Sequence, residues 1–385
     1  MCKASTMKVA VVTYFHDNLT GFMDFSYRVA ALGTIADVDL YCRYSVRQRQ
    51  EFATSRFDEI VVLPRFKGLL SQLDYFMRVT RLIRKKAYDL VVMLGSQGSA
   101  FVPALPRTAR IALYWNEHPS HFFGPSRLRP MRPIRKILRG LCYAGAKKAD
   151  LVMPIGEAHR QDLLAHGVEA QKTQLIQMGV SDAFRPITTG GEPAVNGRVR
   201  FVYAGSVEPD RGRDIMLDAF CSAQDKGLPV HLTIVGAVEA QRQYCQDFIR
   251  QRGAENTITV LGRVSGAEVI GHLRDKDFGI CIWADKEYYR FNPPTKLFEY
   301  QVAGLPVLAN TIATHTHFID NGENGVIFEY DSQSLLQALA QITRHPEKIA
   351  HLKTRSLSRS EHYLWRNIEP EFLRQIEAAT AGDRP

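Results

Sequence analysis

Short runs of β-branched and apolar residues alternate with amphipathic helical patterns along most of this chain, and no other feature restricts the fold as strongly. In the first half, such runs lie at residues 7–15, 38–41, 59–63, 90–94 and 111–115. Strands that alternate with helices are typical of a parallel sheet covered by helices, so we expect a Rossmann-like α/β domain. No GxGxxG sequence follows the first run, which argues against an ordinary nicotinamide enzyme.

The alternation stops near residue 187 and starts again at residue 199. The intervening residues 187–197 are rich in Gly, Pro and Thr, a composition typical of a linker. We therefore expect an N-terminal domain at residues 1–188 and a second Rossmann-like domain from residue 189 onward. Apolar runs at 199–204, 230–235, 258–261 and 278–283 supply the strands of the second sheet.

Composition indicates a globular protein with anionic partners. The chain has 385 residues, is 45% hydrophobic, and carries 49 basic against 40 acidic residues, a net charge of +9. This excess suits phosphates, nucleic acid or an acidic membrane surface. Six scattered cysteines without CxxC spacing predict reduced thiols, and neither a signal peptide nor an apolar stretch of about 20 residues is present. We expect a cytoplasmic protein.

Residues 292–310 read as a loop, a short helix, a glycine stop and a buried strand. Pro293 and Pro294 are tolerated just before a helix, Thr295 is a candidate N-cap, and Gly304 ends the helical run. A helix N-terminus presents unpaired N–H groups and about half a positive charge, which suits an anion such as a diphosphate. Lys296 would add a full charge there.

Glu299 has two interpretations. A glutamate in a first helical turn is stabilised by about 0.3–1 kcal/mol through the helix dipole, or it completes a capping box. The box needs Ser or Thr three residues earlier, where this chain has Lys296. Alternatively the carboxylate accepts both hydroxyls of a ribose, with each charge-assisted bond contributing about 1.5–3 kcal/mol. Spacing alone leaves both open.

Two segments of this region carry a family resemblance. Lys-Leu-Phe-Glu-Tyr at 296–300 and Val-Ala-Gly-Leu-Pro-Val-Leu-Ala at 302–309 resemble the nucleotide-sugar signature of retaining glycosyltransferases of family 4. The resemblance implies an α/β protein of GT-B fold, with two Rossmann-like domains facing across a cleft. It also implies that the second domain covers 189–360, and that a C-terminal helix and tail at 361–385 cross back to the N-terminal domain. Glu299 is then expected to bind the ribose of the donor.

The same resemblance assigns further donor contacts after the first strand of the second domain. Gly205 and Ser206 open a glycine-bounded loop, and Arg211 stands where relatives bind the donor diphosphate. Relatives often have arginine at the position of Ser206, so Arg213 or Lys296 is needed to supply the missing charge. Val264 follows the third strand, where relatives contact the base largely through backbone groups.

The donor sugar itself is not identified by the sequence. Many family members have a glutamate eight positions before the one that binds ribose, and this chain has Phe291 there. Asn292 and Thr295 are the neighbouring candidates for donor binding. Because a phenyl ring cannot replace the hydrogen bonds of a carboxylate, the sugar specificity stays open.

Three loops follow strands of the first sheet and are candidate ligand loops. The first contains Gly21, which the resemblance places near acceptor and donor phosphate, and the second is Gly-Ser-Gln-Gly at 95–98. The third contains His118 and His121. An isolated loop histidine is more often structural, but relatives place a histidine after this strand near the donor sugar, which favours His118 over His121.

Two basic amphipathic segments, at 69–86 and 127–148, have apolar residues at helical spacing. A helix that covers a sheet needs such a stripe, so we expect the apolar residues to be core. The alternative is docking on anionic lipid, where each basic residue contributes about 1 kcal/mol.

Asp-Val-Asp at 37–39 and Asp-Lys-Asp at 275–277 match the metal-binding DxD pattern of a different glycosyltransferase fold. Both lie at the starts of strands, so we interpret them as solvated carboxylates. The family resemblance implies that no divalent metal or other cofactor is required, because the helix dipole and basic residues can stabilise a leaving diphosphate.

The resulting hypothesis is a retaining transferase that moves a sugar from a nucleoside diphosphate to an acceptor hydroxyl. Arg211 and Lys296 would stabilise the diphosphate, and His118 would contact the sugar. The expected acceptor is a lipid-linked or polysaccharide glycan, and the expected place is the cytoplasm, as a peripheral protein on the membrane. A nucleotide-sugar epimerase and an inactive scaffold are the alternatives. No aromatic-basic pattern supports nucleic-acid binding.

Overall fold

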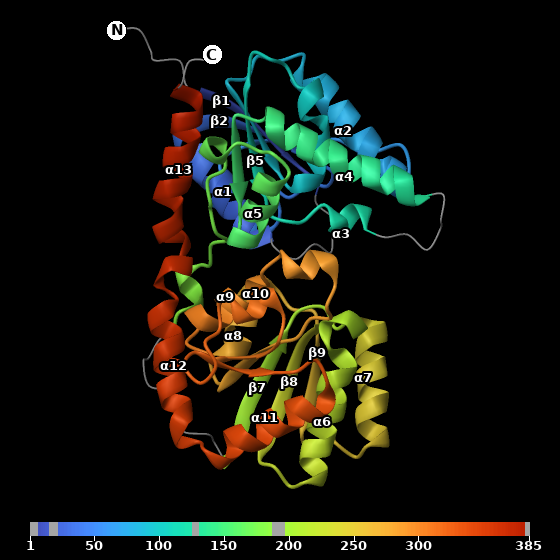
Figure 1. Cartoon of the computed structure of the whole chain (residues 1–385), viewed down its shortest axis with the longest axis vertical. Helices are drawn as coiled ribbons and strands as arrows, with labels where there is room; N and C mark the ends of the chain where they lie inside the picture. The colour runs from blue at the N-terminus through green and yellow to red at the C-terminus, as the bar shows by residue number, and fades with distance from the viewer. Residues whose placement is uncertain (1–6, 15–21, 125–130, 187–196, 382–385) are drawn as a thin grey trace. The chain divides into compact units, whose positions relative to one another are not determined.

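The computed structural model describes residues 7–14, 22–124, 131–186 and 197–381. Its contacts divide the chain into two compact units, Met1–Gly179 with Trp365–Pro385, and Val180–Leu364 (Figure 1). The predicted boundary at 188 and nearly all of the predicted linker lie outside the described residues. The two units are described separately below.

The first unit contains a six-stranded parallel sheet, as the alternating pattern predicts. The strand order is β3-β2-β1-β4-β5-β6, the order of a Rossmann fold. The strands are β1 Met7–Thr13, β2 Ala36–Cys42, β3 Asp58–Val61, β4 Leu90–Leu94, β5 Arg110–Trp115 and β6 Leu151–Pro154.

Helices cover both faces of this sheet. On one face, α2, the 3-10 segment η2 and α4 share one hydrophobic cluster with the strands, and on the other α13 contacts α1, β5 and β6. The helical segments are α1 Phe22–Ile35, α2 Leu69–Ile83, η2 Ser96–Ala104, α3 Ser120–Phe123, α4 Met131–Lys148, α5 Glu157–Ala165 and α13 Trp365–Ala381. The last of these confirms the expected return of the C-terminal helix to the N-terminal unit.

A fully buried arginine fixes α13 to the first unit. Arg28 donates to the Tyr114 hydroxyl at 2.9 Å and to the Gln177 carbonyl at 2.9 Å, and pairs with Asp24 at 3.2 Å. Its guanidinium carbon lies 5.3 Å from the Trp365 ring centroid. A buried charge is tolerated only when it is paired and hydrogen-bonded, and these contacts meet that need.

The second unit repeats the architecture. Its sheet has the order β12-β11-β10-β7-β8-β9, which is the order of the first sheet counted from β7, and all its strands are parallel. The strands are β7 Val199–Ala204, β8 Val230–Ala237, β9 Ile258–Gly262, β10 Phe278–Cys281, β11 Val307–Asn310 and β12 Gly325–Phe328.

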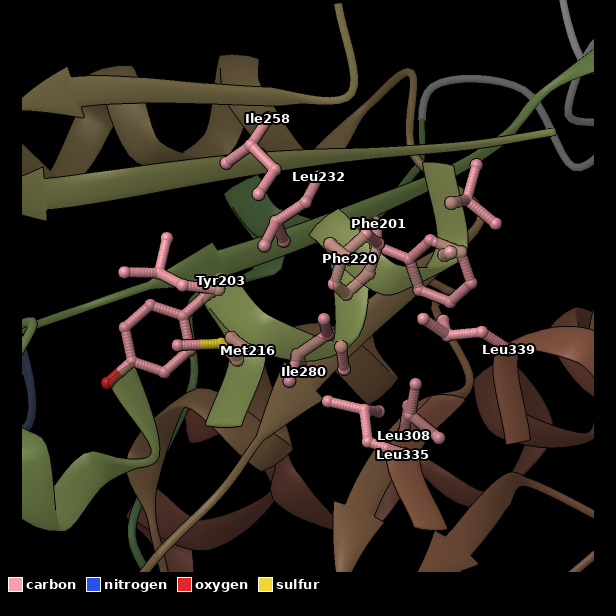
Figure 2. Packing of buried hydrophobic residues seen from close by; sticks show 14 of the residues in the cluster. Phe201, Tyr203, Met216, Phe220, Leu232, Ile258, Ile280, Leu308, Leu335 and Leu339 are labelled. Carbon is pink, nitrogen blue, oxygen red and sulfur yellow. The ribbon is translucent and has the colours of Figure 1, made fainter. Parts of the chain in front are cut away.

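Aromatic and aliphatic side chains from the strands pack against helices α6 and α11 in the second unit (Figure 2). Phe201 stacks on Phe278 with ring centroids 5.4 Å apart and meets Phe220 edge to face. The helical segments are η6 Pro209–Arg211, α6 Arg213–Asp225, α7 Glu239–Gln251, α8 Gly266–Leu273, η7 Glu287–Arg290, α9 Thr295–Val302, α10 Ala313–Thr316, α11 Ser332–Arg344 and α12 Glu347–Arg359.

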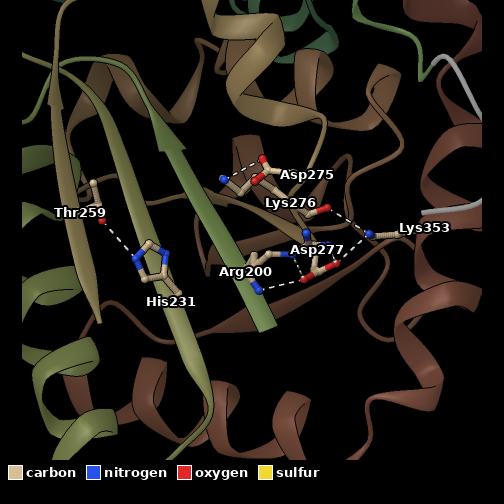
Figure 3. A network of polar contacts seen from close by, with 7 residues as sticks. All are labelled: Arg200, His231, Thr259, Asp275, Lys276, Asp277 and Lys353. Atoms are coloured by element: carbon tan, nitrogen blue, oxygen red, sulfur yellow. Dashed lines mark hydrogen bonds and ion pairs between the residues drawn. The ribbon is translucent and has the colours of Figure 1, made fainter. Parts of the chain in front are cut away.

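The second DxD sequence is part of a buried ion-pair network (Figure 3). Asp277 accepts from Arg200 at 3.1 and 3.2 Å and from Lys353 at 2.9 Å, which joins β7, the start of β10 and α12. Asp275 instead pairs with its neighbour Lys276 near the surface. In the first unit, Asp39 accepts from Lys86 and Tyr88. The carboxylates of Asp39 and Asp277 are therefore occupied by the protein's own donors. The expectation of a solvated carboxylate is wrong for Asp277, because packing of α12 against the start of β10 buries it between Arg200 and Lys353.

Candidate functional site

The candidate site lies at the carboxyl edge of the second sheet, where ligands of parallel sheets bind. The loop after β7 begins at Gly205, which has φ +139°, a conformation that side chains rarely adopt. A Cβ atom at Gly205 would lie 2.8 Å from Nζ of Lys296. Gly236, in β8, has φ +111°, and its Cβ would lie 2.6 Å from the Gly205 carbonyl oxygen. Only glycines permit this close approach.

Tyr300 positions helix α9 over the sheet. The Ala204 N–H at the end of β7 donates to the Tyr300 hydroxyl at 2.8 Å. The Tyr300 ring fits over Gly279 so closely that a Cβ there would lie 2.2 Å from it. Residues four apart share one helix face, so this anchor also directs Lys296 toward the end of β7.

The helix starts one residue earlier than predicted. Thr295 is the first helical residue rather than the N-cap, and Pro294 occupies the N-cap position without a side-chain hydrogen bond. The fixed φ of proline already suits the residue that precedes a helix, so no hydroxyl cap is needed to define the start. Gly304 ends the helix with φ +73°, as predicted.

Lys296 is a buried cation without a hydrogen-bond acceptor among the described residues. The residue is 8% exposed, and its ammonium nitrogen lies 3.6 Å from the centroid of the Tyr203 ring. Burial, together with the charge of Arg211, lowers its pKa to about 7. A cation held in this way is poised to gain from an incoming anion.

Arg211 is a second cation supported by rings rather than by a carboxylate. Its guanidinium carbon lies 5.5 Å from the Trp283 ring and 5.6 Å from the Tyr289 ring, and these two rings stack with centroids 4.3 Å apart. The adjacent Asp210 accepts from Lys286 instead. Within the described part of the chain, the Arg211 guanidinium makes no salt bridge.

Arg213 does not supply the charge missing at Ser206. Its guanidinium forms two hydrogen bonds with the neighbouring Asp214, at 2.8 and 3.1 Å, and stacks on Tyr244 at 3.8 Å. Of the two residues considered for this role, Lys296 is the one whose charge stays uncompensated.

Glu299 is the unpaired anion of the site. Its carboxylate is half-buried and accepts no hydrogen bond from the described residues, and burial raises its pKa to about 7 although the Lys296 charge opposes the rise. A half-buried carboxylate without donors is available to the hydroxyls of a ligand.

The remaining predicted donor residues lie in loops or at a helix start near the same edge. Ser206 directly follows Gly205, and its carbonyl accepts from the Tyr203 hydroxyl at 2.7 Å. Val264 follows β9, Asn292 lies two residues before the N-cap of α9, and Thr295 opens that helix; all three are half-buried.

His118 lies in the first unit, where both of its ring nitrogens have partners. The Ser120 N–H donates to Nδ1 at 3.2 Å, so the proton is on Nε2, which donates to the Tyr143 hydroxyl at 3.1 Å. Tyr143 in turn donates to Asp162 at 2.6 Å. The more exposed His121 contacts Glu117. The predicted Gly21 lies outside the described residues.

Several residues of the site were not predicted from the sequence. Tyr203, Trp283 and Tyr289 support the two cations, and Tyr300 fixes the helix. Tyr203 is the next-to-last residue of the predicted strand 199–204, and Trp283 is the last residue of the predicted strand 278–283. Their position at the carboxyl ends of strands was the signal available. Asn310 exchanges two hydrogen bonds with the Trp283 backbone, at 2.9 and 3.0 Å, and holds that loop.

Two family models match consecutive parts of the chain. A glycosyl transferase 4-like domain matches residues 11–179, and the glycosyl transferases group 1 model matches residues 198–345. This chain belongs to the group 1 glycosyltransferases. Its two parallel sheets have the GT-B fold of that family, and the enzyme is a transferase, which disfavours the epimerase alternative. No curated protein sequence is significantly similar to the transferase.

Solved structures share the fold at low sequence identity. Alr3699/HepE from Anabaena, crystallised with UDP and glucose, has a TM-score of 0.74 and 15% identity, covering 97% of the transferase and 100% of that chain. A sucrose-phosphate synthase from Thermosynechococcus elongatus has a TM-score of 0.75 with the same identity and coverage. The lipopolysaccharide outer core galactosyltransferase WaaB has a TM-score of 0.67 and 13% identity, covering 97% and 99%. Within the described ranges, no helix is long and apolar enough to cross a bilayer.

Proposed function

We propose that this transferase moves a sugar from a nucleoside diphosphate to an acceptor hydroxyl, with retention at the anomeric carbon. The observation that supports this most directly is the pair of uncompensated cations, Lys296 and Arg211, next to the unpaired carboxylate of Glu299. Two cations suit a diphosphate, and a carboxylate one turn into α9 suits the ribose attached to it.

In the proposed reaction, Lys296 and Arg211 bind the diphosphate and stabilise the charge that develops as the bond to the sugar breaks. Charge-assisted hydrogen bonds of this kind are strongest in a site shielded from water, and burial of Lys296 provides that shielding. These cations and the N-terminus of α9 supply the neutralising charge, so the proposal requires no metal or other cofactor.

We propose UDP as the nucleotide, because the structurally similar Alr3699/HepE was crystallised with UDP, with UDP and glucose, and with UDP-glucose. The acceptor is proposed to be a glycan of a growing cell-surface polysaccharide or one linked to a lipid at the cytoplasmic face of the membrane. His118 is proposed to contact the donor sugar, and the Tyr143–Asp162 pair would hold its imidazole in one orientation. Val264, Asn292 and Thr295 complete the proposed donor contacts.

Thermal unfolding with UDP, GDP and ADP tests the donor site on the wild type and on Glu299→Ala. A ligand at a hundred times its dissociation constant stabilises the folded state by about 2.7 kcal/mol. We expect UDP to raise the melting temperature of the wild type and to have little effect on Glu299→Ala. If no nucleotide stabilises the wild type, the proposed site is wrong.

Retention and turnover need a separate measurement. Once a donor is identified, the anomeric configuration of the transferred sugar can be read from NMR coupling constants. The same configuration in donor and product supports retention, and inversion contradicts it. Nucleotide binding without release of UDP in the presence of glycan acceptors would favour the inactive scaffold, which Ser206 and Phe291 motivate.

A further inference from the structure

Helix α4 in the N-terminal unit exposes an apolar stripe. Ile134, Ile137 and Leu141 are all exposed, with Ile137 at 63%, and their spacing of three and four residues places them on one helix face. The other face packs on the sheet through Cys142 and Ala146. The sequence-based expectation that the apolar residues of this segment are core is therefore wrong for the outer stripe.

Helix α2 and the loop before it show the same pattern. Leu63, Phe66, Leu70 and Met77 are exposed, with Leu63 at 62%, while Phe76 and Ile83 of α2 are buried in the core. Phe66 is flanked by the exposed residues Arg65 and Lys67. An exposed aromatic between two cations is typical of segments that enter a membrane interface.

The two helices belong to one face of the molecule. Both pack against η2, through the stacking of Phe76 on Phe101 at 5.1 Å and through Gly145, whose Cβ would overlap the Ser99 carbonyl. Each helix follows a strand of a parallel sheet, so both begin at its carboxyl edge, where loops bind ligands. We call the exposed apolar side chains and their basic neighbours the α2/α4 surface, with Leu63, Phe66, Leu70, Met77, Ile134, Ile137 and Leu141 as its apolar part.

The two segments that bear this surface carry more than the whole net charge of the chain. Residues 63–86 include seven basic residues and one acidic residue, and residues 131–148 include six basic residues and none that are acidic. Their net charge is +12, whereas the chain has +9, so the rest is net negative by three. The single acidic residue, Asp74, is buried and accepts the Arg65 N–H at 2.7 Å.

We propose that the α2/α4 surface docks on an anionic lipid bilayer, with the apolar side chains entering the interface and the basic side chains contacting phosphate head groups. A nucleic acid would match the charge but would leave the apolar stripes exposed to water. A second copy would match the stripes but would bring two strongly positive surfaces together. The inference rests on the proposed function and deepens it, because docking would hold the N-terminal unit next to a lipid-linked acceptor.

Flotation of the full chain with phosphatidylcholine vesicles, with and without phosphatidylglycerol, tests the proposal. We expect binding only to the anionic vesicles. Ile137→Glu should reduce this binding by about tenfold or more, and Lys136→Glu by a similar factor, because each basic residue contributes roughly fivefold. Phe66→Ser, in a loop outside the helices, should also reduce binding and does not depend on the integrity of α4.

Leu175→Glu is the matched control for Ile137→Glu, since it adds the same charge at an exposed leucine elsewhere in the N-terminal unit. It should bind vesicles like the wild type. Absence of binding to anionic vesicles overturns the proposal. The proposal is also overturned if high salt abolishes vesicle binding but Ile137→Glu and Phe66→Ser do not change it. That result would indicate a general affinity for polyanions.

Sedimentation of each variant without lipid tests whether the α2/α4 surface instead binds a second copy of the chain. The proposal is also overturned if the wild type self-associates but does not bind vesicles, and Ile137→Glu abolishes the self-association. Stabilisation by UDP is measured on the same samples and should be equal in all of them. A protein that binds vesicles but no nucleotide would contradict the proposed function alone, and the reverse result would contradict only the docking.

Discussion

The ammonium nitrogen of Lys296 lies 3.6 Å from the centroid of the Tyr203 ring, and no hydrogen-bond acceptor of the described residues reaches it. A cation–π contact contributes about 0.5–2 kcal/mol, whereas taking an ammonium out of water costs several kcal/mol. The ring therefore does not offset the cost of burial. An anion that binds at Gly205 would offset the cost of burying the ammonium, so the contact between Lys296 and Tyr203 indicates an anion-binding site.

Replacing this lysine should stabilise the unliganded protein. Lys296→Met keeps the length of the side chain and removes the unpaired charge, so we expect the free energy of unfolding to rise by about 1–3 kcal/mol. The melting temperature should rise, while stabilisation by UDP should disappear. Lys226→Met, at an exposed position of the same unit, should change neither quantity. A lower melting temperature for Lys296→Met would show that the charge is already paired.

The stability of the unliganded protein should depend on pH through Lys296 and Glu299. Burial raises the pKa of Glu299 from 4.5 to about 7, so the folded state binds more protons than the unfolded state between these values. Stability from this group falls as pH rises from 4.5 to about 7. Burial lowers the pKa of Lys296 from 10.5 to about 7, so its contribution rises from about pH 7 to 10.5.

The two effects together make the destabilisation largest near neutral pH. The melting temperature of the wild type, minus that of the double variant Lys296→Met/Glu299→Gln, should be most negative near pH 7. The difference should be smaller at about pH 4.5, where only the Lys296 penalty remains, and at about pH 10, where only the Glu299 penalty remains. A difference that does not change with pH would contradict the assigned shifts. Saturating UDP should reduce the dependence in the wild type, because bound diphosphate favours the charged lysine.

Gly205→Ala should weaken nucleotide binding. The new methyl group would lie 2.8 Å from Nζ of Lys296, at a backbone φ of +139° that alanine adopts poorly. We expect the dissociation constant for UDP, measured by calorimetry, to rise by about tenfold or more, since roughly 1.4 kcal/mol corresponds to tenfold. Gly227→Ala is the control, because its φ is also positive, at +66°, but its Cβ meets open space. Equal effects of both variants on affinity would rule out a specific role for Gly205.

Asp277→Asn should destabilise the second unit. Burial alone raises the pKa of Asp277, but hydrogen bonds from Arg200 and the charge of Lys353 outweigh it and hold the pKa below its usual value. Removing one partner of a buried ion pair costs about 3–5 kcal/mol. Asp275→Asn, at the exposed end of the same Asp-Lys-Asp sequence, should cost less than about 1 kcal/mol.

Acid should remove the same stabilisation. Because the pKa of Asp277 is lowered in the folded state, its contribution is present above the unfolded pKa and is lost as pH falls through the folded value. The difference in melting temperature between the wild type and Asp277→Asn should therefore shrink below about pH 4. A difference that persists in acid would indicate a packing defect instead.

The periodicity of the sequence was sufficient to predict both sheets, because most of the strands are apolar runs that are largely buried; β3, at the edge of the first sheet, is the exception. Residues 90–94 and 199–204 are strands with the predicted bounds. The predicted strand ends differ from the observed ones where turn geometry, rather than hydrophobicity, sets the end. For example, β10 ends at Cys281 and not at the predicted residue 283. The apolar spacing of α4 predicted a helix, which is confirmed, but spacing cannot tell an inner stripe from an outer one, and the expected core position is wrong for Ile134, Ile137 and Leu141.

By itself, the sequence determined the fold class, the family, and the residue types of the proposed donor site, since glycine, lysine and glutamate stand at fixed places after strands and at the start of one helix. Only the tertiary structure decided which charges are paired. Arg213 lies two residues from Arg211, yet its salt bridge with Asp214 removes it from the site while aromatic rings support Arg211. The rings of Trp283 and Tyr289 reach Arg211 from a distant part of the chain, and the sequence alone does not show whether Arg213 pairs with the adjacent Asp214 or points into the site.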